Sequence, residues 1–305
     1  TTVAISAPQH DGSKGHVKVY QYSNNAWTQL GQDIDGEAAE DYSGYSVSLS
    51  NDGTTLAIGA PYNNDNRYNA GHVRVYQYVN NAWTQLGQDI DGESLYDQSG
   101  YSVSLSSDGT ILAISAPGND GNGVYSGHVR VYQYVNNAWT QLGQDIDGEA
   151  EGDYSGKSVS LSSDGTILAI GATHNDANGN ASGHVRVYQY ANNTWTQMGS
   201  DIDGEAVSDE GGVVSLNSDG TIVAIGAYYN GEDSGIYNVD GTNINYIYND
   251  NSFNLVGKGG GGGGGFAGNT TYYQPNSGGS SGGIGTTYST NTQMLSSIET
   301  TQGNT

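Results

Sequence analysis

The residues best suited to chemistry in this sequence are acidic, and they recur in a fixed pattern. In the first copy, Asp33, Asp35 and Glu37 alternate along the chain, Gly36 separates the last two, and Asp41 follows. The pattern returns at intervals of 56 residues, as Asp89, Asp91, Glu93 and Asp97, then Asp145, Asp147, Glu149 and Asp153, then Asp201, Asp203, Glu205 and Asp209. Alternate carboxylates with a turning glycine suit a short loop that folds around Ca²⁺, which binds six to eight oxygens. We therefore predict a metal site in each loop, with these carboxylates as ligands and Ca²⁺ as the cofactor.

A second interpretation of the same acids needs no ion. The carboxylates would cap turns, accept hydrogen bonds from backbone N–H groups, or hold neighbouring repeats in register. Clustered anionic oxygens are costly without a cation, which favours calcium. Calcium loops also use a carbonyl donor and often a bidentate terminal Glu, and the sequence identifies neither. A second acidic loop, 119–123 and again 175–179, would complete a site or only turn the chain, and turning is the favoured interpretation.

Four histidines recur with the same spacing, at the start of one predicted strand in each repeat: His16, His72, His128 and His184. Together they could ring an axis as metal ligands. Because they lie on strands expected near the outside, we predict a packed or hydrogen-bonded role for them.

The repetition itself argues against catalysis. An active site needs an asymmetric set of groups in different environments, whereas every candidate group here occurs in several near-identical copies. The glycine run 259–265 has no strand–helix context of a phosphate loop. We expect no enzyme activity and no catalytic residues.

Charge narrows the partners further. The chain of 305 residues has 32 acidic and 8 basic residues and a net charge of −24. Nucleic acids and anionic membranes are bound through clustered Lys and Arg, so we expect neither as a partner. There is no cysteine, and no apolar run approaches the ~18 residues of a membrane span.

A repeat of 56 residues must position these groups. The string Gly-His-Val-(Lys/Arg)-Val-Tyr-Gln-Tyr begins at Gly15, Gly71, Gly127 and Gly183, and one tryptophan per repeat keeps the same spacing. A diverged fifth copy places Tyr246, Tyr248, Phe253 and Gly257 at the positions of Tyr20, Tyr22, Trp27 and Gly31.

Each repeat reads as four short antiparallel strands, exemplified by residues 46–50, 56–60, 72–78 and 82–86. Asp52-Gly53 predicts a two-residue hairpin with positive φ, and Asn80-Asn81 predicts the turn between the last two strands. Small residues on the first two strands suit a crowded axis, and Tyr and Trp on the outer strands suit the wider gap between sheets. These features predict an all-β fold, a β-propeller with five visible blades. A β-solenoid is the rival, although its repeats are usually shorter.

The repeat resembles a known family. Residues 45–48, 57–61 and 71–76 are similar to the FG-GAP repeat of integrin α-subunit propellers and their bacterial and algal relatives, which implies a propeller over residues 1–257. In that family Phe-Gly opens the first strand, whereas this chain has Gly44-Tyr45. The family's calcium loop between the first two strands is shortened here to Ser-x-Asp-Gly-Thr, so that site is not carried over.

The two ends of the repeat array differ from its middle. Residues 1–8 align with 54–61, so the first blade lacks its first strand. Either residues upstream of Thr1 or the tail would supply it, and Met294–Ile298 is the candidate strand in the tail. Residues 258–305 are rich in Gly, Ser, Thr and Asn and are expected to form a flexible tail.

Topology predicts where ligands bind. In an antiparallel blade, the connections between strands two and three and between strand four and the next blade share one end. Both are long and acidic here, and elaborated loops on a rigid scaffold commonly carry binding sites. We therefore expect a non-catalytic propeller that serves in adhesion or recognition and binds a protein or a glycan. Its expected location is extracellular or on the surface of a cell or virion.

The alternative is a structural subunit of an extracellular filament, sheath or virion coat, which would bind copies of itself and order the tail on assembly. Sequons at Asn180, Asn192 and Asn269 predict N-glycosylation if the protein is secreted by a eukaryote.

Overall fold

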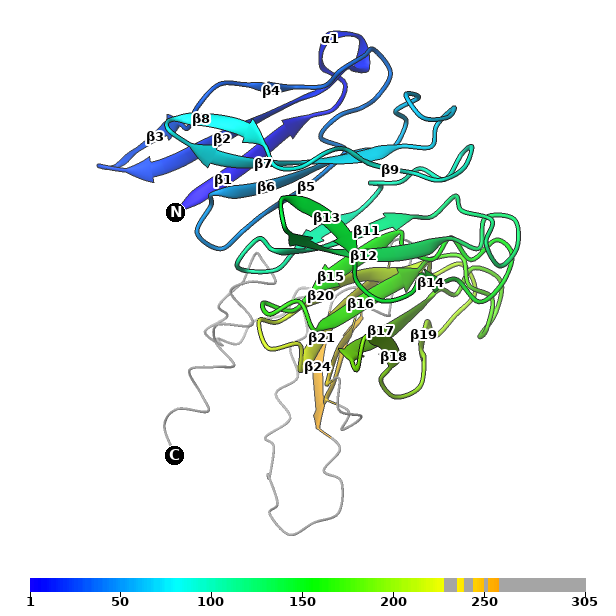
Figure 1. Cartoon of the computed structure of the whole chain (residues 1–305). Coiled ribbons are helices and arrows are strands. Elements are labelled where there is room, and N and C mark those ends of the chain that lie inside the picture. Colours follow the sequence, from blue (N-terminus) through cyan, green and yellow to red (C-terminus); the bar gives the residue numbers. More distant parts are fainter. Residues whose placement is uncertain (228–234, 239–243, 250–251, 258–305) are drawn as a thin grey trace, which may run out of the picture. The chain divides into compact units, whose positions relative to one another are not determined.

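The computed structural model describes residues 1–227, 235–238, 244–249 and 252–257. Three sheets are built alike, with four strands in sequence order and a fifth, short strand beside the third (Figure 1). The second sheet contains β5 (Ser46–Leu49), β6 (Thr55–Ala60), β7 (His72–Val79), β8 (Ala82–Gln85) and β9 (Ile90–Asp91). The third contains β10 (Val103–Leu105), β11 (Ile111–Ala116), β12 (His128–Val135), β13 (Ala138–Gln141) and β14 (Ile146–Asp147). The fourth contains β15 (Ser158–Leu161), β16 (Ile167–Ala172), β17 (His184–Ala191), β18 (Thr194–Gln197) and β19 (Ile202–Asp203).

The first sheet lacks one strand among the described residues. It contains β1 (Thr2–Ala7), β2 (His16–Ser23), β3 (Ala26–Gln29) and β4 (Ile34–Asp35), in the order β1-β2-β3 with β4 beside β2. β1 pairs with β2 as β6 pairs with β7, so it is the second strand of its blade, as predicted. One four-residue helical turn, α1 (His10–Ser13), lies in the connection between β1 and β2.

The fifth repeat departs from the others. β20 (Gly211–Leu216) and β21 (Ile222–Ala227) form the usual hairpin, but β21 then pairs with β22 (Gly235–Asn238). β23 (Ile244–Asn249) and β24 (Ser252–Gly257) follow as a separate hairpin. Tyr248 pairs with Phe253 there as Tyr22 pairs with Trp27 in the first sheet. The diverged fifth copy therefore keeps the backbone register of the outer hairpin, as predicted.

The two tight turns of each blade have different chemistry. Asn80 and Asn81 both have positive φ, at 52° and 64°, as a type I′ hairpin turn requires. The prediction for Asp52-Gly53 was wrong in detail, because Gly53 has positive φ and Asp52 does not. β5 and β6 last pair at Leu49 and Leu56, which leaves a loop longer than two residues. The Asp52 carboxylate closes that loop by accepting hydrogen bonds from Ser50 Oγ and from the N–H of Thr54.

Neighbouring sheets are joined at both edges. Serine hydroxyls on the first strands accept hydrogen bonds from the next sheet: Ser48 Oγ from Leu105 N–H, and Ser104 Oγ from Leu161 N–H, each at 3.0 Å. Small polar residues let these strands approach and satisfy the backbone there. At the outer edge, Trp139 packs in the core between the second and third sheets. The prediction that Trp residues fill the space between blades is confirmed for Trp83, Trp139 and Trp195, whereas Trp27 of the first sheet is exposed.

These four-stranded sheets, packed in chain order through their first strands, are blades of a β-propeller. The small residues of the strands β6, β11 and β16 are buried almost throughout, and the alternating valines of the third strands complete the core. Within the described ranges, no helix has the length and apolar character needed to cross a membrane. The predicted tail 258–305, its candidate strand Met294–Ile298 and the sequon Asn269 lie outside the described residues.

Candidate functional site

The two long connections of each repeat pack together at one end of the sheets, as the topology predicts. The N–H of Tyr96, in the connection between β9 and β10, donates to the carbonyl of Tyr68, in the connection between β6 and β7, at 3.0 Å. The next repeat has the same contact, from the N–H of Tyr154 to the carbonyl of Tyr125 at 3.0 Å. Farther along the same two connections, the N–H of Ser99 donates to the carbonyl of Ala70. We call this surface the loop end.

Exposed aromatic side chains accompany these backbone contacts. The rings of Tyr68 and Tyr96 meet edge to face with centroids 5.3 Å apart, and those of Tyr125 and Tyr154 stack at 5.3 Å. Tyr68, Tyr96 and Tyr125 are exposed. Beside them, further apolar side chains are exposed at the same connections: Leu95, Val124 and Val207. The acidic and histidine patterns gave no indication of these residues, although tyrosine recurs at nearly the repeat spacing.

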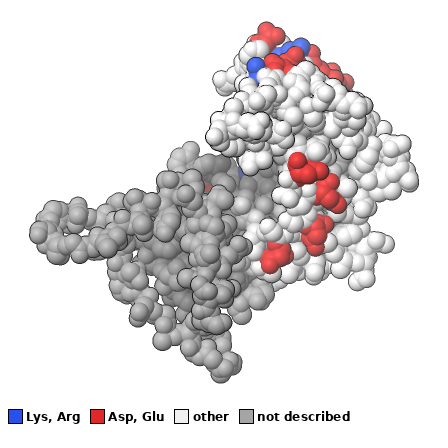
Figure 2. Space-filling model, turned by 90° about the vertical axis from the view of Figure 1, so that its left-hand side faces the viewer, with Lys and Arg blue, Asp and Glu red and all other residues white. Residues whose placement is uncertain are grey.

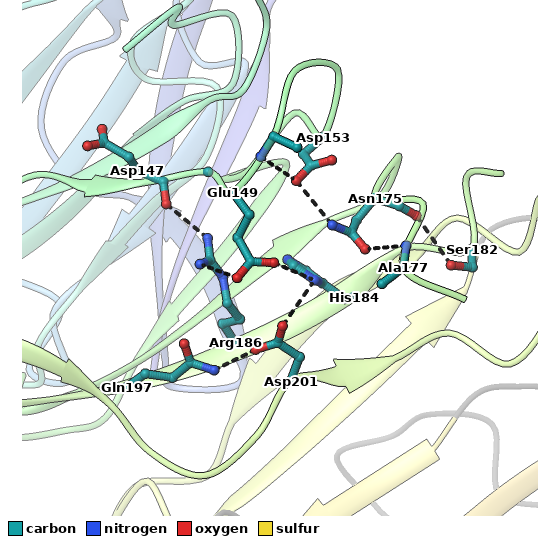
Figure 3. A network of polar contacts seen from close by, with 12 residues as sticks. Asp147, Glu149, Asp153, Asn175, Ala177, Ser182, His184, Arg186, Gln197 and Asp201 are labelled. Atoms are coloured by element: carbon teal, nitrogen blue, oxygen red, sulfur yellow. Dashed lines mark hydrogen bonds and ion pairs between the residues drawn. The ribbon is translucent and has the colours of Figure 1, made fainter. Parts of the chain in front are cut away.

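The last aspartate of each acidic pattern is buried and caps its own loop. Asp153 accepts hydrogen bonds from the N–H of Ala150 and from Asn175 Nδ2, each at 3.1 Å (Figure 3). Burial raises the pKa of the equivalent Asp97 carboxyl despite hydrogen bonds from Ser94 and Asn119. All four such residues are buried: Asp41, Asp97, Asp153 and Asp209. This position matches the capping interpretation.

The acidic loops 119–123 and 175–179 turn the chain, as favoured from the sequence. Asn175 Oδ1 accepts from the N–H of Ala177, and Asn119 Oδ1 accepts from the N–H of Gly121. Asn122 and Asn178 then bind the neighbouring acidic pattern through its backbone, with Nδ2 donating to the carbonyls of Gly148 and Gly204.

The first half of each acidic pattern is extended rather than curled. Its Ile and second Asp form the short strands β4, β9, β14 and β19, which the sequence did not reveal. His72 pairs with Asp91, and Val73 pairs with Ile90. The second aspartates are exposed: Asp35, Asp91, Asp147 and Asp203. The glycine that follows is needed for close packing, because a Cβ on Gly92 would lie 2.1 Å from the carbonyl oxygen of Ala70.

The four carboxylates of one loop therefore do not gather into one cluster in the described structure. Instead, the glutamate of one pattern meets a histidine and the first aspartate of the next repeat. Among the described residues, three such groups have ligand atoms within 4.8 Å of one another: Glu37–His72–Asp89, Glu93–His128–Asp145 and Glu149–His184–Asp201. We call them the Glu–His–Asp clusters. Three of the four repeated histidines, for which we predicted a packed or hydrogen-bonded role, lie at their centres.

Figure 3 shows the third cluster. His184 Nδ1 lies 3.8 Å from Glu149 Oε2 and 3.9 Å from Asp201 Oδ2. The other oxygens of both acids are anchored: Glu149 Oε1 lies 3.4 Å from Arg186 Nη1, and Asp201 Oδ1 accepts from Gln197 Nε2 at 2.5 Å. Arg186 Nη2 also donates to the Asp147 carbonyl at 2.9 Å. An arginine and a glutamine thus aim one oxygen of each acid at the histidine.

The first cluster repeats this geometry. His72 Nδ1 lies 3.8 Å from Asp89 Oδ2 and 4.0 Å from Glu37 Oε2. Arg74 Nη1 lies 3.2 Å from Glu37 Oε1, and Gln85 Nε2 donates to Asp89 Oδ1. Burial, then the charge of the nearby arginine, lowers the pKa of His72 below its usual value, and the same two causes act on His184.

The middle cluster and the first sheet differ. Arg130 spans both acids of the middle cluster, with Nη2 paired to Glu93 Oε2 and Nε donating to Asp145 Oδ1 at 3.2 Å. In the first sheet, Lys18 replaces the arginine and pairs with Asp33 at 3.2 Å. Hydrogen bonds from Gln29 and then Lys18 lower the pKa of Asp33.

Charge is distributed unevenly at the surface. Acidic side chains form separate patches on the face in Figure 2, and basic ones are few. Three of the eight basic residues are buried in the Glu–His–Asp clusters: Arg74, Arg130 and Arg186. The sequon residues Asn180 and Asn192 are exposed, and their glycosylation stays a prediction.

Comparison with known proteins agrees with the repeat and the fold. The FG-GAP repeat family matches residues 34–76 and 146–188, each of which runs from an acidic pattern to the next third strand. No curated protein is similar to the chain in sequence.

A crystal structure from Bacteroides uniformis, assigned as a 6-phosphogluconolactonase, is similar in fold with a TM-score of 0.52 and 13% identity, over 75% of this chain and 63% of that one. The chain thus spans less than two thirds of that protein. TolB from Acinetobacter baumannii gives a TM-score of 0.46 and 14% identity, over 82% of this chain and 53% of TolB.

Proposed function

Because this chain is built from FG-GAP repeats on a β-propeller fold, we propose that it is a non-catalytic binding module, displayed outside the cell, that recognises a glycan or protein through the loop end. The observation that carries this proposal is the pairing of exposed tyrosines there. Contiguous exposed apolar patches on soluble proteins commonly mark interaction sites.

The chemistry of the loop end favours a glycan. Tyrosine offers an apolar ring face and a polar hydroxyl, which suits the apolar faces and hydroxyl groups of sugars. The acidic residues Glu93 and Glu149, exposed on the adjoining connections, are acceptors for sugar hydroxyls. Because Tyr68 and Tyr125 occupy the same connection in successive repeats, one chain offers similar sites side by side. Several weak sites then add avidity for a repeating polymer.

A glycan array probed with the full chain tests the proposal. We expect binding to a repeating glycan, and at least a tenfold loss in the double variant Tyr68→Ala with Tyr125→Ala, since two aromatic contacts of about 1 kcal/mol each exceed the ~1.4 kcal/mol of a tenfold change in affinity. The matched control is Tyr22→Ala: Tyr22 is also exposed and packs on Trp27, but it lies beside the Asn24-Asn25 turn at the other end of its sheet.

Two outcomes would contradict this function. Equal loss in the Tyr22→Ala control would show that the loop end is not the binding surface. A blank array together with spontaneous polymerisation would favour the structural role in a filament, sheath or coat. Calcium binding stays a prediction: after EDTA treatment, heat on titration with Ca²⁺ and a higher melting temperature would support it, and neither effect at millimolar Ca²⁺ would remove it.

A further inference from the structure

We propose that two of the Glu–His–Asp clusters, Glu37–His72–Asp89 and Glu149–His184–Asp201, are binding sites for a divalent transition-metal ion of the Zn²⁺ class. The proposal groups some of the predicted calcium ligands differently, because each cluster joins the glutamate of one acidic pattern to a histidine and the first aspartate of the next repeat. It uses none of the tyrosines of the glycan proposal and shares only Glu149 with it.

The buried histidines carry the inference. His72 and His184 are each 1% exposed, and their Nδ1 atoms are buried with no hydrogen-bond partner. Buried polar atoms in native proteins nearly always have a partner. Each Nδ1 instead faces two carboxylate oxygens at 3.8–4.0 Å, beyond hydrogen-bond distance. A cation between the three atoms would satisfy all of them.

The dimensions and charge suit such an ion. Zinc binds His nitrogen and carboxylate oxygen at about 2.0–2.2 Å, which places tetrahedral ligand atoms about 3.4 Å apart. Each Nδ1 lies 3.8–4.0 Å from the two carboxylate oxygens, and the three ligand atoms of a cluster all lie within 4.8 Å of one another. Binding therefore needs a contraction, which the half-exposed side chains of Glu37 and Glu149 can supply by rotating about their arginine contacts. With a neutral histidine, two carboxylates and one arginine, each cluster carries one net negative charge.

The donor set selects the class of metal. Calcium takes six to eight oxygens, whereas imidazole nitrogen suits zinc, copper and nickel. The supporting hydrogen bonds also resemble those of metal sites, in which outer residues orient the ligands. Here Gln85 and Arg74 hold the far oxygens of Asp89 and Glu37, so the near oxygens face His72.

The chain contains its own comparison site. In the middle cluster Arg130 contacts Glu93 and Asp145 directly, so a cation would have to displace the guanidinium from both acids. Its histidine lies 4.0 Å from Asp145 Oδ2 alone. We therefore expect two tight sites per chain rather than three.

The experiment is a titration of the untagged full chain, freed of metal with EDTA, using Co²⁺ absorbance and Zn²⁺ calorimetry. The rings of His10 and His16 lie 4.2 Å apart at the surface, so all variants carry His10→Ala to remove that adventitious pair. We expect the chain with both histidines to bind two equivalents of metal. His72→Gln and His184→Gln should each bind one equivalent, and the residual binding of the double variant should be at least a hundredfold weaker. His128→Gln should keep two.

Glu149→Gln provides a second test that spares the buried histidine and keeps an oxygen beside Arg186, and it should weaken one site at least tenfold while the metal-free chain remains folded. Millimolar Ca²⁺ should not displace the bound Zn²⁺. Binding below half an equivalent, or two equivalents retained by the folded double histidine variant, would overturn the proposal.

Discussion

The first sheet and the interior sheets have nearly the same sequence but very different surroundings. Trp27 is 52% exposed, whereas Trp139 is 6% exposed. Ile5 is 54% exposed, and Ile58, which holds the equivalent position in β6, is 1% exposed because it packs between the first and second sheets. The comparison teaches that burial in this fold belongs to pairs of sheets. A single repeat cannot bury both faces of its own sheet.

Polar groups show the same contrast. Arg186 is buried and bridges the Glu149 side chain and the Asp147 carbonyl, both from the preceding repeat. Lys18, at the same position of the first sheet, forms a half-exposed pair with Asp33 of its own sheet. Polar residues of the interior sheets therefore join consecutive repeats, and those of the first sheet do not.

The largest expected effect on stability tests the contrast between Trp139 and Trp27. Trp139→Ala should reduce the free energy of unfolding by about 3–5 kcal/mol, because it opens a cavity between two sheets and leaves the Leu86 carbonyl without its Trp donor. Trp27→Ala should cost less than about 1 kcal/mol, since half of the ring already contacts solvent. Guanidinium unfolding curves measure both. Trp139→Phe serves as the milder variant if the alanine protein does not fold, and equal losses at the two positions would refute the comparison.

A smaller effect is expected for the two basic residues. Arg186→Ala should cost about 1–3 kcal/mol, because a carbonyl and a partly buried carboxylate lose their donor. Lys18→Ala should change stability by less than about 1 kcal/mol, as is usual for half-exposed ion pairs. Unfolding curves recorded in high salt distinguish the two positions. Salt should reduce the loss of stability caused by Lys18→Ala and leave most of the loss caused by Arg186→Ala. A reversed order would contradict the view that interior polar contacts join the repeats.

The smallest expected effect concerns how stability depends on pH through Asp52. This residue lies in the turn between β5 and β6, and the described first sheet has no equivalent turn. Hydrogen bonds from Ser50 and Thr54 lower the pKa of Asp52. A lowered folded-state pKa gives stability that is present above the unfolded pKa, about 3.9, and is lost as pH falls through the folded value. Asp52→Asn should therefore lower the melting temperature slightly at pH 7, and the difference from the parent protein should shrink as pH falls below about 4. Parallel curves for both proteins would disprove this role.

The sequence was sufficient for the repeating parts of the fold. Strand positions, the Asn-Asn turns, the tryptophans between sheets and the common end of the long connections all follow from local periodicity, which is repeated often enough to be unambiguous. The short strand at Ile90-Asp91 was missed because two residues carry no periodic signal. Its pairing with the start of β7 depends on a chain reversal that spacing does not reveal.

The sequence identified the acidic residues of the candidate site but not how they are grouped in space. Acidic residues at alternate positions suggested ligands within one loop, and the structure distributes them over capping, strand and cluster positions. Glu37 lies 35 residues from His72 in the sequence, and the two meet only because one connection packs against the following sheet. Contacts between repeats are invisible in a repeat examined by itself.

The serine hydroxyls on the first strands have an evolutionary consequence. Because Ser48 and Ser104 present the same acceptor to the next sheet, each interior repeat fits either neighbour. Residues 71–93 and 127–149 are identical, as recent duplication of a genetic unit would leave them. Unequal recombination that inserts or deletes a whole unit would preserve every junction, so lineages of such proteins would change length in steps of one repeat while keeping the same loop end.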